Sequence, residues 1–317
     1  MMKNFLTIGE PMAVFSADQA DVELADAQHF TKYIAGAELN VAIGLARLQH
    51  RVEYVTALGN DPFGVTIQNE IKANQISTQY VEIMPEYWTG FYLKQRVTTG
   101  DPAVYFYRQN SAAAHFDSDM LDKVDYQKID LIHLTGIMAA ISDNGLTAVK
   151  RLFEKAHENQ ISTTFDPNIR KPLWASETEM IMTLNSLAKE ATIVLPGINE
   201  GEILMGSRDP EQIADFYLNQ SNHTQTAIVK LGPAGAYIKN KTGLNTTVTG
   251  YSVRHVVDTV GAGDGFAVGL ISGLLDEQPI ESAVKRACAI GALAVQSAGD
   301  SEGYPDNEQL EQFMEEN

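Results

Sequence analysis

The sequence has little cysteine, few basic residues and no long apolar run. Its single cysteine, Cys288, cannot form an internal disulfide, so we expect a buried, unreactive thiol and a reducing compartment. No apolar stretch approaches the roughly 20 residues that a membrane span requires, and the short apolar start before Glu10 does not resemble a signal peptide. We therefore expect a soluble protein of the cytoplasm.

The charge balance and the missing motifs exclude several classes of protein. There are 41 acidic and 23 basic residues, and the formal net charge of −18 makes nucleic acid and anionic membranes poor partners. The seven histidines are scattered without an HExxH pair, which argues against a metal hydrolase. The first predicted strand is followed by Gly9-Glu10-Pro11 instead of GxGxxG, which argues against a nicotinamide dehydrogenase.

Short apolar runs alternate with segments of helical periodicity along the chain. The predicted strands are residues 52–57, 131–134, 163–165, 193–195 and 227–229, and the predicted helices are residues 38–48, 64–74, 144–159, 200–205, 263–275 and 280–297. This alternation predicts an α/β fold whose mostly parallel central sheet is covered by helices on both faces.

Two segments, residues 13–35 and 80–110, interrupt the alternation. The second contains a predicted hairpin that turns at residues 98–102. We interpret both segments as a small β-strand lid inserted into a single domain of residues 1–317, because the chain has no repeat or linker that would mark a second domain.

A glycine-rich turn near the carboxyl end is the segment that best indicates a reaction. A strand-like stretch, residues 252–257, leads to Gly261 and Gly263, and a helical run follows. Glycines allow the turn to approach a ligand closely, and the helix start offers unpaired N–H groups to an anion. A carboxylate there suits phosphoryl transfer, with Asp264 accepting the proton of an acceptor hydroxyl. In the alternative interpretation, Asp264 only caps the helix.

Residues 258–264 (DTVGAGD) closely resemble the carboxy-terminal signature of the PfkB, or ribokinase-like, sugar kinases. Further matches follow in the order of that family, at residues 35–42 (AGAELNVA), 59–64 (GNDPFG), 199–202 (NEGE) and 230–235 (KLGPAG). The resemblance implies a ribokinase-like three-layer α/β/α fold, ATP and Mg²⁺ as cofactors, and a homodimer or higher homo-oligomer formed through the lid.

The resemblance also implies roles for individual residues. Asp264 would be the catalytic base, and Gly261, Ala262 and Gly263 would form the anion hole. The nucleotide would contact Asn199, Lys230, Gly232, Gly235, Gly261 and Gly263; Asn199 and Glu202 would hold Mg²⁺ through water; and Asp258 would contact a monovalent cation such as K⁺. Glu200 is expected on a solvated helix face, and an ordinary strand-end lysine is an equal alternative for Lys230.

The lid and the segment after one predicted strand contain side chains that are typical of a substrate-binding site. Side-chain alternation places Tyr92 and Lys94 on one lid face and Phe106 with Arg108 on another. Arg170 follows a predicted strand end, and two arginines suit a carboxylate, although surface acids could pair with them instead.

These segments and residues 299–303 (GDSEG) resemble the 2-keto-3-deoxygluconate kinase branch. The position of a second substrate-contacting tyrosine corresponds to Phe106, or to Tyr107 if the register is shifted by one residue. The implied substrate contacts are Gly36, Asn40, Tyr92, Phe106, Arg108, Arg170 and Asp264. A fructokinase-like or ribokinase-like neutral-sugar kinase and a non-catalytic sugar-acid sensor are the alternatives.

Overall fold

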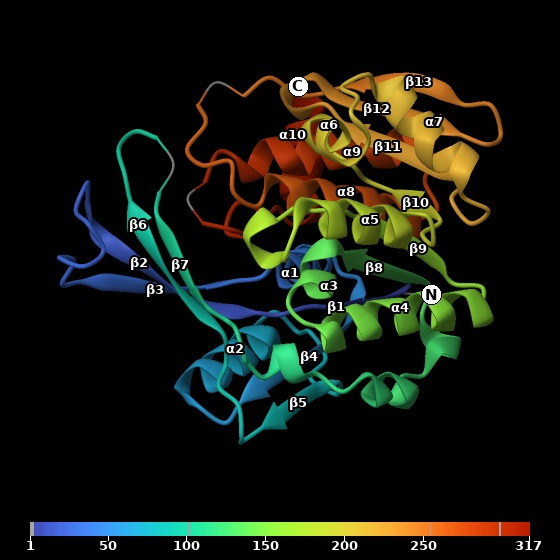
Figure 1. Ribbon diagram of the computed structural model, residues 1–317. Coiled ribbons are helices and arrows are strands. Elements are labelled where there is room, and N and C mark those ends of the chain that lie inside the picture. Colours follow the sequence, from blue (N-terminus) through green and yellow to red (C-terminus); the bar gives the residue numbers. More distant parts are fainter. Residues whose placement is uncertain (1–2, 101, 254, 298) are drawn as a thin grey trace.

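The computed structural model describes residues 3–100, 102–253, 255–297 and 299–317, which form one large and one small β-sheet (Figure 1). The large sheet has the order β13-β12-β11-β10-β9-β8-β1-β4-β5. Its strands are β1 (Asn4–Ile8), β4 (Arg51–Gly59), β5 (Val81–Met84), β8 (Leu131–Thr135), β9 (Ser162–Asp166), β10 (Ile193–Val194), β11 (Thr226–Lys230), β12 (Gly235–Asn240) and β13 (Asn245–Thr249). All neighbours from β5 to β11 pair in parallel, and β12 and β13 add an antiparallel edge.

Helices cover both faces of the large sheet, as the alternation of the sequence predicts. One apolar cluster joins one face of the sheet to α1 (Ala37–Arg47), α2 (Pro62–Ala73), α8 (Ala262–Leu275), α9 (Ile280–Ala294) and α10 (Asn307–Glu316). A second cluster joins the other face to α3 (Gly136–Ala140), α4 (Asp143–Glu158), α5 (Glu177–Ala188), α6 (Ile198–Met205) and α7 (Pro210–Gln220). Neighbouring strand residues contribute to opposite clusters, as Phe5 and Leu6 do, because side chains alternate across a strand. The three-layer α/β/α prediction is confirmed.

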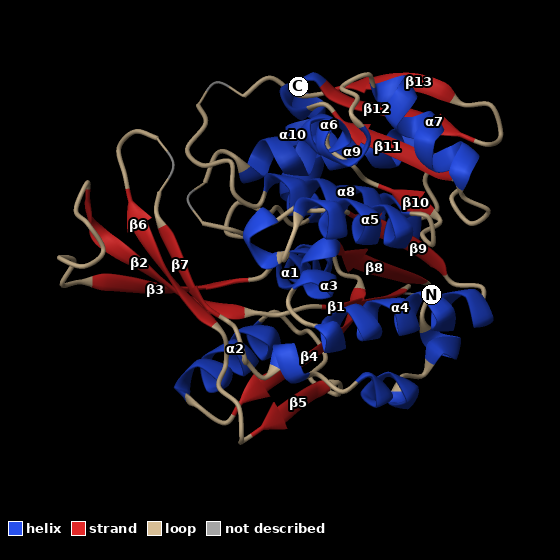
Figure 2. Cartoon of the chain, in the orientation of Figure 1, coloured by secondary structure: helices blue, strands red, loops and turns tan. Residues whose placement is uncertain are grey.

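The small sheet, called the lid sheet below, projects from the body of the molecule (Figures 1 and 2). It has the order β3-β2-β6-β7, from β2 (Met12–Ala20), β3 (Phe30–Ala35), β6 (Phe91–Arg96) and β7 (Val104–Tyr107). These strands match the two segments that interrupt the α/β alternation, except that β2 begins one residue earlier, and β6 and β7 form the predicted hairpin. β5 also lies in the second segment, but it pairs with β4 in the large sheet. Asp101, in its predicted turn, lies outside the described residues.

One predicted element is wrong. The stretch of residues 252–257 forms no strand among its described residues, and Arg254 lies outside them. The last strand before α8 is β13, which ends at Thr249. Within the part of the chain that the structure describes, no helix is long and apolar enough to cross a membrane.

The parallel strands end together at one edge of the large sheet. Gly9 and Glu10 follow β1, Asp166 ends β9 and Lys230 ends β11. Along the chain, strands are added first on one side of β1 and then, from β8 onward, on the other. Because ligands bind beyond the carboxyl ends of strands near such a reversal, this edge is where a site is expected.

Candidate active site

A cavity of about 540 Å³ lies at this edge, between the lid sheet and the first turn of α8. Its wall is made by residues from most parts of the chain. They are Glu10, Met12, Ala35, Gly36, Ala37, Glu38, Asn40, Tyr92, Phe106, Arg108, Ile137, Asp166, Asn168, Arg170, Pro172, Leu173, Glu200, Lys230, Thr259, Val260, Gly261, Gly263, Asp264 and Asp300.

The turn before α8 is fixed by the segment that follows α9. Gly261 has φ +78°, and a Cβ atom built on it would lie 2.0 Å from the carbonyl oxygen of Asp300, so only glycine fits this position. The Tyr304 hydroxyl donates a hydrogen bond of 2.7 Å to the Gly261 carbonyl oxygen. Gly261 is the N-cap of α8, and the N–H groups of the first turn therefore have no acceptor within the helix.

Asp264 is the third residue of α8, so it does not cap the helix, and its carboxylate lines the cavity. The Asn40 side-chain amide donates to its Oδ2 at 2.9 Å, and that of Asn168 donates to its Oδ1 at 3.4 Å. Burial raises the pKa of Asp264 to about 7; the hydrogen bond from Asn40 opposes the shift, and the negative charges of Asp166 and Asp300 add to it. Such a carboxyl can accept a proton near neutral pH.

A second carboxylate of the cavity wall is also perturbed. Burial raises the pKa of Asp300 to about 6, although the positive charge of Lys94 opposes the shift. Lys94 belongs to lid strand β6, and its Nζ lies 3.7 Å from Oδ2 of Asp258 in the loop before α8. An ion pair therefore connects the lid sheet with the segment that leads into the glycine turn before α8.

On the floor of the cavity, Lys230 at the end of β11 forms an ion pair with Asp166 at the end of β9. Burial disfavours the charged lysine, but the carboxylates of Asp166 and Glu200 outweigh this effect and raise the pKa of Lys230. The Glu200 carboxylate accepts hydrogen bonds from the backbone N–H of Gly197 at 2.6 Å and of Ile169 at 2.9 Å. These bonds hold Glu200 toward the cavity.

At the lid side of the cavity, Arg108 and Glu10 form a buried ion pair. Nε of Arg108 donates to Oε2 of Glu10 at 2.7 Å, and Nη2 lies 2.5 Å from the same oxygen. The other carboxylate oxygen accepts a hydrogen bond of 2.5 Å from the Ser111 hydroxyl. Arg108 is only 7% exposed, so Glu10 both compensates its charge and fixes its direction.

Arg170 differs from Arg108 in its surroundings. It lies exposed at the cavity wall, and Nη1 donates only to the backbone carbonyl oxygen of Ile169, at 3.2 Å. Among the described residues, no carboxylate forms a salt bridge with Arg170. Arg170 therefore supplies positive charge that an anionic ligand can use.

The whole chain was compared with known proteins. A family model described as pfkB family carbohydrate kinase matches residues 2–307. The chain belongs to this family. A 2-dehydro-3-deoxygluconokinase of Bacillus subtilis (strain 168) is 41% identical over 315 residues, which are 99% of this chain and 96% of that protein.

Solved structures give the same result. The crystal structure of a PfkB protein from Polaromonas sp. JS666 is 39% identical and has a TM-score of 0.89 over 98% of this chain and 99% of that one. A ribokinase II from E.coli in complex with ATP and Mg²⁺ is 25% identical, with a TM-score of 0.90 over 100% of both chains. The predicted family and ribokinase-like fold are confirmed, and the protein is a carbohydrate kinase, a phosphotransferase with an alcohol group as acceptor.

Many of the residues that the sequence singles out meet in the cavity. These are Gly36, Asn40, Tyr92, Phe106, Arg108, Arg170, Lys230, Gly261, Gly263 and Asp264. The predicted separation of lid faces is wrong, because Tyr92 and Phe106 are directly paired across β6 and β7, with ring centroids 5.0 Å apart, and share the face toward the cavity.

The assignment of Glu202 and Asn199 to Mg²⁺ is not supported by their positions. Both side chains are outside the cavity wall; Asn199 is exposed, and Glu202 pairs with Arg208 at 2.8 Å on the surface. Glu200 is on the cavity side instead of on a solvated face. Residues two apart point in nearly opposite directions from a helix, so only one of the two glutamates can face the site.

Four other residues of the predicted set lie near the cavity but outside its wall. Ala262 opens α8, and Gly232 and Gly235 form the turn between β11 and β12 with φ of +62° and +104°. The Asp258 carboxylate accepts a hydrogen bond of 3.0 Å from the Val260 backbone N–H. Their predicted contacts with nucleotide or cation stay predictions.

Sequence reasoning missed the roles in the cavity of Glu10, Asp166, Asn168, Glu200 and Asp300. A signal existed for the first two, since each follows or ends an apolar strand at the edge where parallel strands terminate. Asn168 and Asp300 lie in segments that the family resemblance marks, but no spacing within the sequence shows that they approach Asp264.

Proposed function

We propose that this kinase transfers the γ-phosphoryl group of ATP to the terminal hydroxyl of 2-keto-3-deoxygluconate, also called 2-dehydro-3-deoxygluconate, or of a similar sugar acid. The observation that carries the proposal is that Asp264 and two arginines, Arg108 and Arg170, line the same cavity. The 41% identity to the Bacillus subtilis enzyme supports the same substrate. We also propose that the enzyme acts in the cytoplasm, where ATP is available.

In the proposed reaction, Asp264 accepts the proton of the sugar hydroxyl. The oxygen of that hydroxyl forms a bond to the γ-phosphorus while the bond between this phosphorus and the β,γ-bridging oxygen breaks, which gives a phosphate ester and ADP. The N–H groups at the start of α8, at the N-cap Gly261 and at Ala262 and Gly263, would stabilise the negative charge on the transferring group. Asn40 and Asn168 hold the carboxylate of Asp264 in place.

The wall of the cavity fits a nucleotide phosphate with its magnesium ion. A Cβ atom on Gly263 would meet no other heavy atom within 4 Å, so phosphate oxygens can approach the start of α8. Glu200 and Asp166 supply the oxygen ligands that Mg²⁺ prefers, and they would hold it through water molecules. When bound, Mg²⁺ neutralises phosphate charge. We propose that the carboxylate of Asp258 contacts a monovalent cation such as K⁺.

The two arginines have different proposed tasks in substrate recognition. Arg170 has no carboxylate partner among the described residues and would bind the carboxylate of the sugar acid. Arg108 is compensated by Glu10, so it would donate directed hydrogen bonds to uncharged oxygens. Tyr92, Phe106 and Gly36 would shape the space around the sugar.

An assay of ADP release with separate sugars tests this proposal. We expect turnover with 2-keto-3-deoxygluconate and much weaker turnover with fructose, ribose and gluconate. Turnover of fructose or ribose alone would support the neutral-sugar kinase. Binding of the keto acid by calorimetry without any ADP release would support the sensor and contradict the proposed reaction.

We further propose a homodimer formed through the lid sheet. Its edge strands β3 and β7 leave backbone groups available for pairing, and β7 exposes Tyr105 and Tyr107, with Tyr105 60% exposed. Light scattering after size-exclusion chromatography should give a mass of about twice 34.7 kDa. Tyr105→Glu should shift this mass toward that of one chain, and an unchanged dimer would contradict the use of β7.

A further inference from the structure

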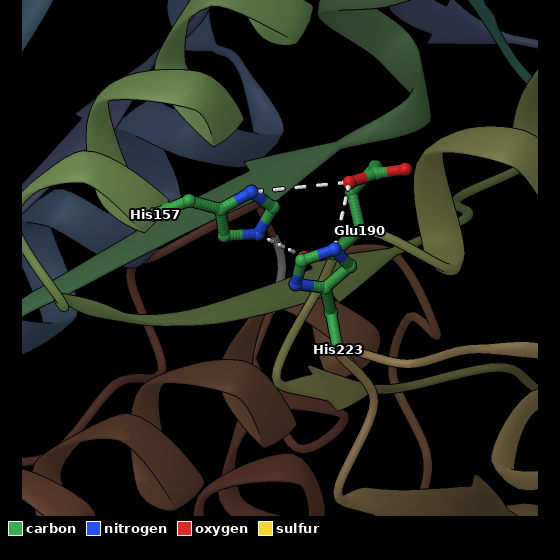
Figure 3. A group of neighbouring side chains, drawn as sticks. All are labelled: His157, Glu190 and His223. Carbon is green, nitrogen blue, oxygen red and sulfur yellow. Dashed lines mark hydrogen bonds and ion pairs between the residues drawn. The ribbon is translucent and has the colours of Figure 1, made fainter.

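A cluster of two histidines and one glutamate lies far from the cavity, at the opposite edge of the large sheet. His157 is near the end of α4, Glu190 follows α5 and His223 follows α7 (Figure 3). The three segments lead into β9, β10 and β11, and the active-site cavity lies at the carboxyl ends of these strands. One potential ligand atom from each residue lies within 4.8 Å of those of the others.

The hydrogen bonding of His157 fixes which of its nitrogens faces the cluster. Nε2 lies 2.9 Å from the backbone carbonyl oxygen of Glu190, which can only accept, so Nε2 carries a hydrogen. In the neutral ring, the lone pair is therefore on Nδ1, which faces Oε2 of Glu190 at 3.9 Å (Figure 3). Metal-binding histidines are commonly held in this way, with the second nitrogen donating to a backbone carbonyl.

The same carboxylate oxygen also faces His223, whose Nε2 lies 3.7 Å away. Both nitrogen-to-oxygen distances are too long for hydrogen bonds. They are close to the separation of about 3.4 Å between two ligands of a tetrahedral ion with bonds of about 2.0–2.1 Å. Each nitrogen therefore lies at about the distance from Oε2 of Glu190 that two ligands of one small cation would have.

We propose that His157, Glu190 and His223 form a binding site for a transition-metal ion of the zinc class. Two imidazoles and one carboxylate are ligands that favour Zn²⁺, Co²⁺ or Ni²⁺ over Mg²⁺. Glu190 and His223 also line a separate cavity of about 500 Å³, which gives an ion a path and a water ligand. The bound ion would connect three segments that no disulfide joins.

The neighbouring lysine does not compete for the carboxylate. Nζ of Lys189 lies 2.9 Å from the side-chain oxygen of Gln220 and 5.0 Å from the centre of the Phe216 ring. No salt bridge joins Lys189 to Glu190 in the described part of the chain. The carboxylate thus faces the two imidazoles.

Metal binding requires a rotation of His223. The two imidazole rings are stacked, with centroids 4.0 Å apart and planes 10° from parallel. An ion bound through a ring nitrogen lies near the plane of that ring, and two stacked rings share no such position. His157 is held by its hydrogen bond, whereas His223 has a side chain that is 46% exposed and is free to turn.

Titration calorimetry with ZnCl₂, in the presence of excess Mg²⁺, tests the site in the full-length protein. We expect one Zn²⁺ per chain, and at least about tenfold weaker binding for His157→Gln, Glu190→Gln and His223→Gln. Two controls should keep the wild-type affinity: His29→Gln, which removes an exposed histidine of the lid region, and Asp264→Asn, which removes a carboxylate of the active site.

Two further measurements separate loss of the site from loss of the fold. Each variant should unfold at nearly the wild-type temperature without metal, and only proteins with the intact cluster should gain thermal stability on adding Zn²⁺. Co²⁺ should give visible absorption in the same proteins. Equal Zn²⁺ affinity in wild type and His223→Gln, or no binding by the wild type, would overturn the proposal and leave the cluster as a pair of imidazoles beside a carboxylate.

Discussion

Replacing Asp264 by asparagine should inactivate the enzyme and stabilise its fold at the same time. The carboxylate is held in a cavity wall beside two other acids, and its pKa is raised to about 7 from an ordinary value of 3.8. At about 1.36 kcal/mol per pKa unit, this difference corresponds to about 4 kcal/mol against the ionised form in the folded protein. Water reaches the carboxyl and reduces the effect, so we expect about 2 to 4 kcal/mol.

The pH dependence of this stabilisation follows from the direction of the pKa change. Below about pH 4 the carboxyl is protonated in the folded and unfolded states, and the substitution should have little effect. Between about pH 4 and pH 7 only the unfolded state releases the proton, so the wild type loses stability relative to the variant as pH rises. Above about pH 7 the difference is complete, and at pH 5 it should be less than half of this value.

Thermal unfolding of the protein without nucleotide measures the effect. With an unfolding entropy of about 2.1 cal/mol/K per residue over 317 residues, the variant should melt about 3 to 6 °C higher at pH 8. Asparagine can still accept the hydrogen bond from Asn40, and the bond from Asn168, which it loses, is long at 3.4 Å. Turnover should fall by about 100- to 10 000-fold while ATP affinity stays nearly unchanged.

Glu281→Gln is a matched control, because Glu281 is an exposed acid in the first turn of α9. Its removal should lower stability slightly, by up to about 1 kcal/mol, because a surface carboxylate near a helix start is favourable. If Asp264→Asn is no more stable than wild type at pH 8, or if its advantage is the same at pH 5, the carboxyl is not strained by burial and the reasoning is wrong.

Four further predictions follow from the site. The value of kcat/KM should fall about tenfold per pH unit below about pH 7 in a pH-rate profile. A profile in which kcat/KM begins to fall only near pH 4 would contradict Asp264 as the base. Arg170→Gln should lower kcat/KM for the keto acid by about 10- to 100-fold and leave that for fructose nearly unchanged, as initial rates with both sugars will show. Glu10→Gln should lower the free energy of unfolding in urea by about 3 kcal/mol, because it leaves a buried arginine uncompensated; a change below 1 kcal/mol would refute the buried pair. Glu200→Gln should reduce kcat by about tenfold or more, whereas Glu202→Gln should retain nearly full activity, and the reverse order would restore the predicted role of Glu202.

Local sequence pattern predicts the layers of this fold because it reports local geometry. The short apolar runs of β4 and β8 and the periodicity of α1 and α4 place the large sheet between helices, and the glycine turn locates the start of α8. The antiparallel strands β12 and β13 were not predicted. Three of the five residues in β13 are exposed polar ones, so an edge strand of this kind has only a weak apolar signal.

The errors at the site arise from contacts between distant segments. Arg108 and Glu10 are 98 positions apart, and no local pattern shows that a buried acid compensates this arginine. The register of the β6–β7 hairpin, which pairs Tyr92 with Phe106, depends on the length of its turn and not on alternation within either strand. Glu200 faces the cavity because backbone N–H groups from two segments bind it, which the spacing from Asn199 cannot reveal.

The contact of Gly261 with Asp300, together with the Tyr304 hydrogen bond, has a consequence for the order in which the enzyme is made. The turn that positions Asp264 rests on residues that leave the ribosome about 40 positions later. We therefore expect a nascent chain that has completed the large sheet and α8, but not residues 300–304, to lack kinase activity. A protein shortened just before residue 299 should keep most of the core yet lose the contacts that hold the turn beside Asp264.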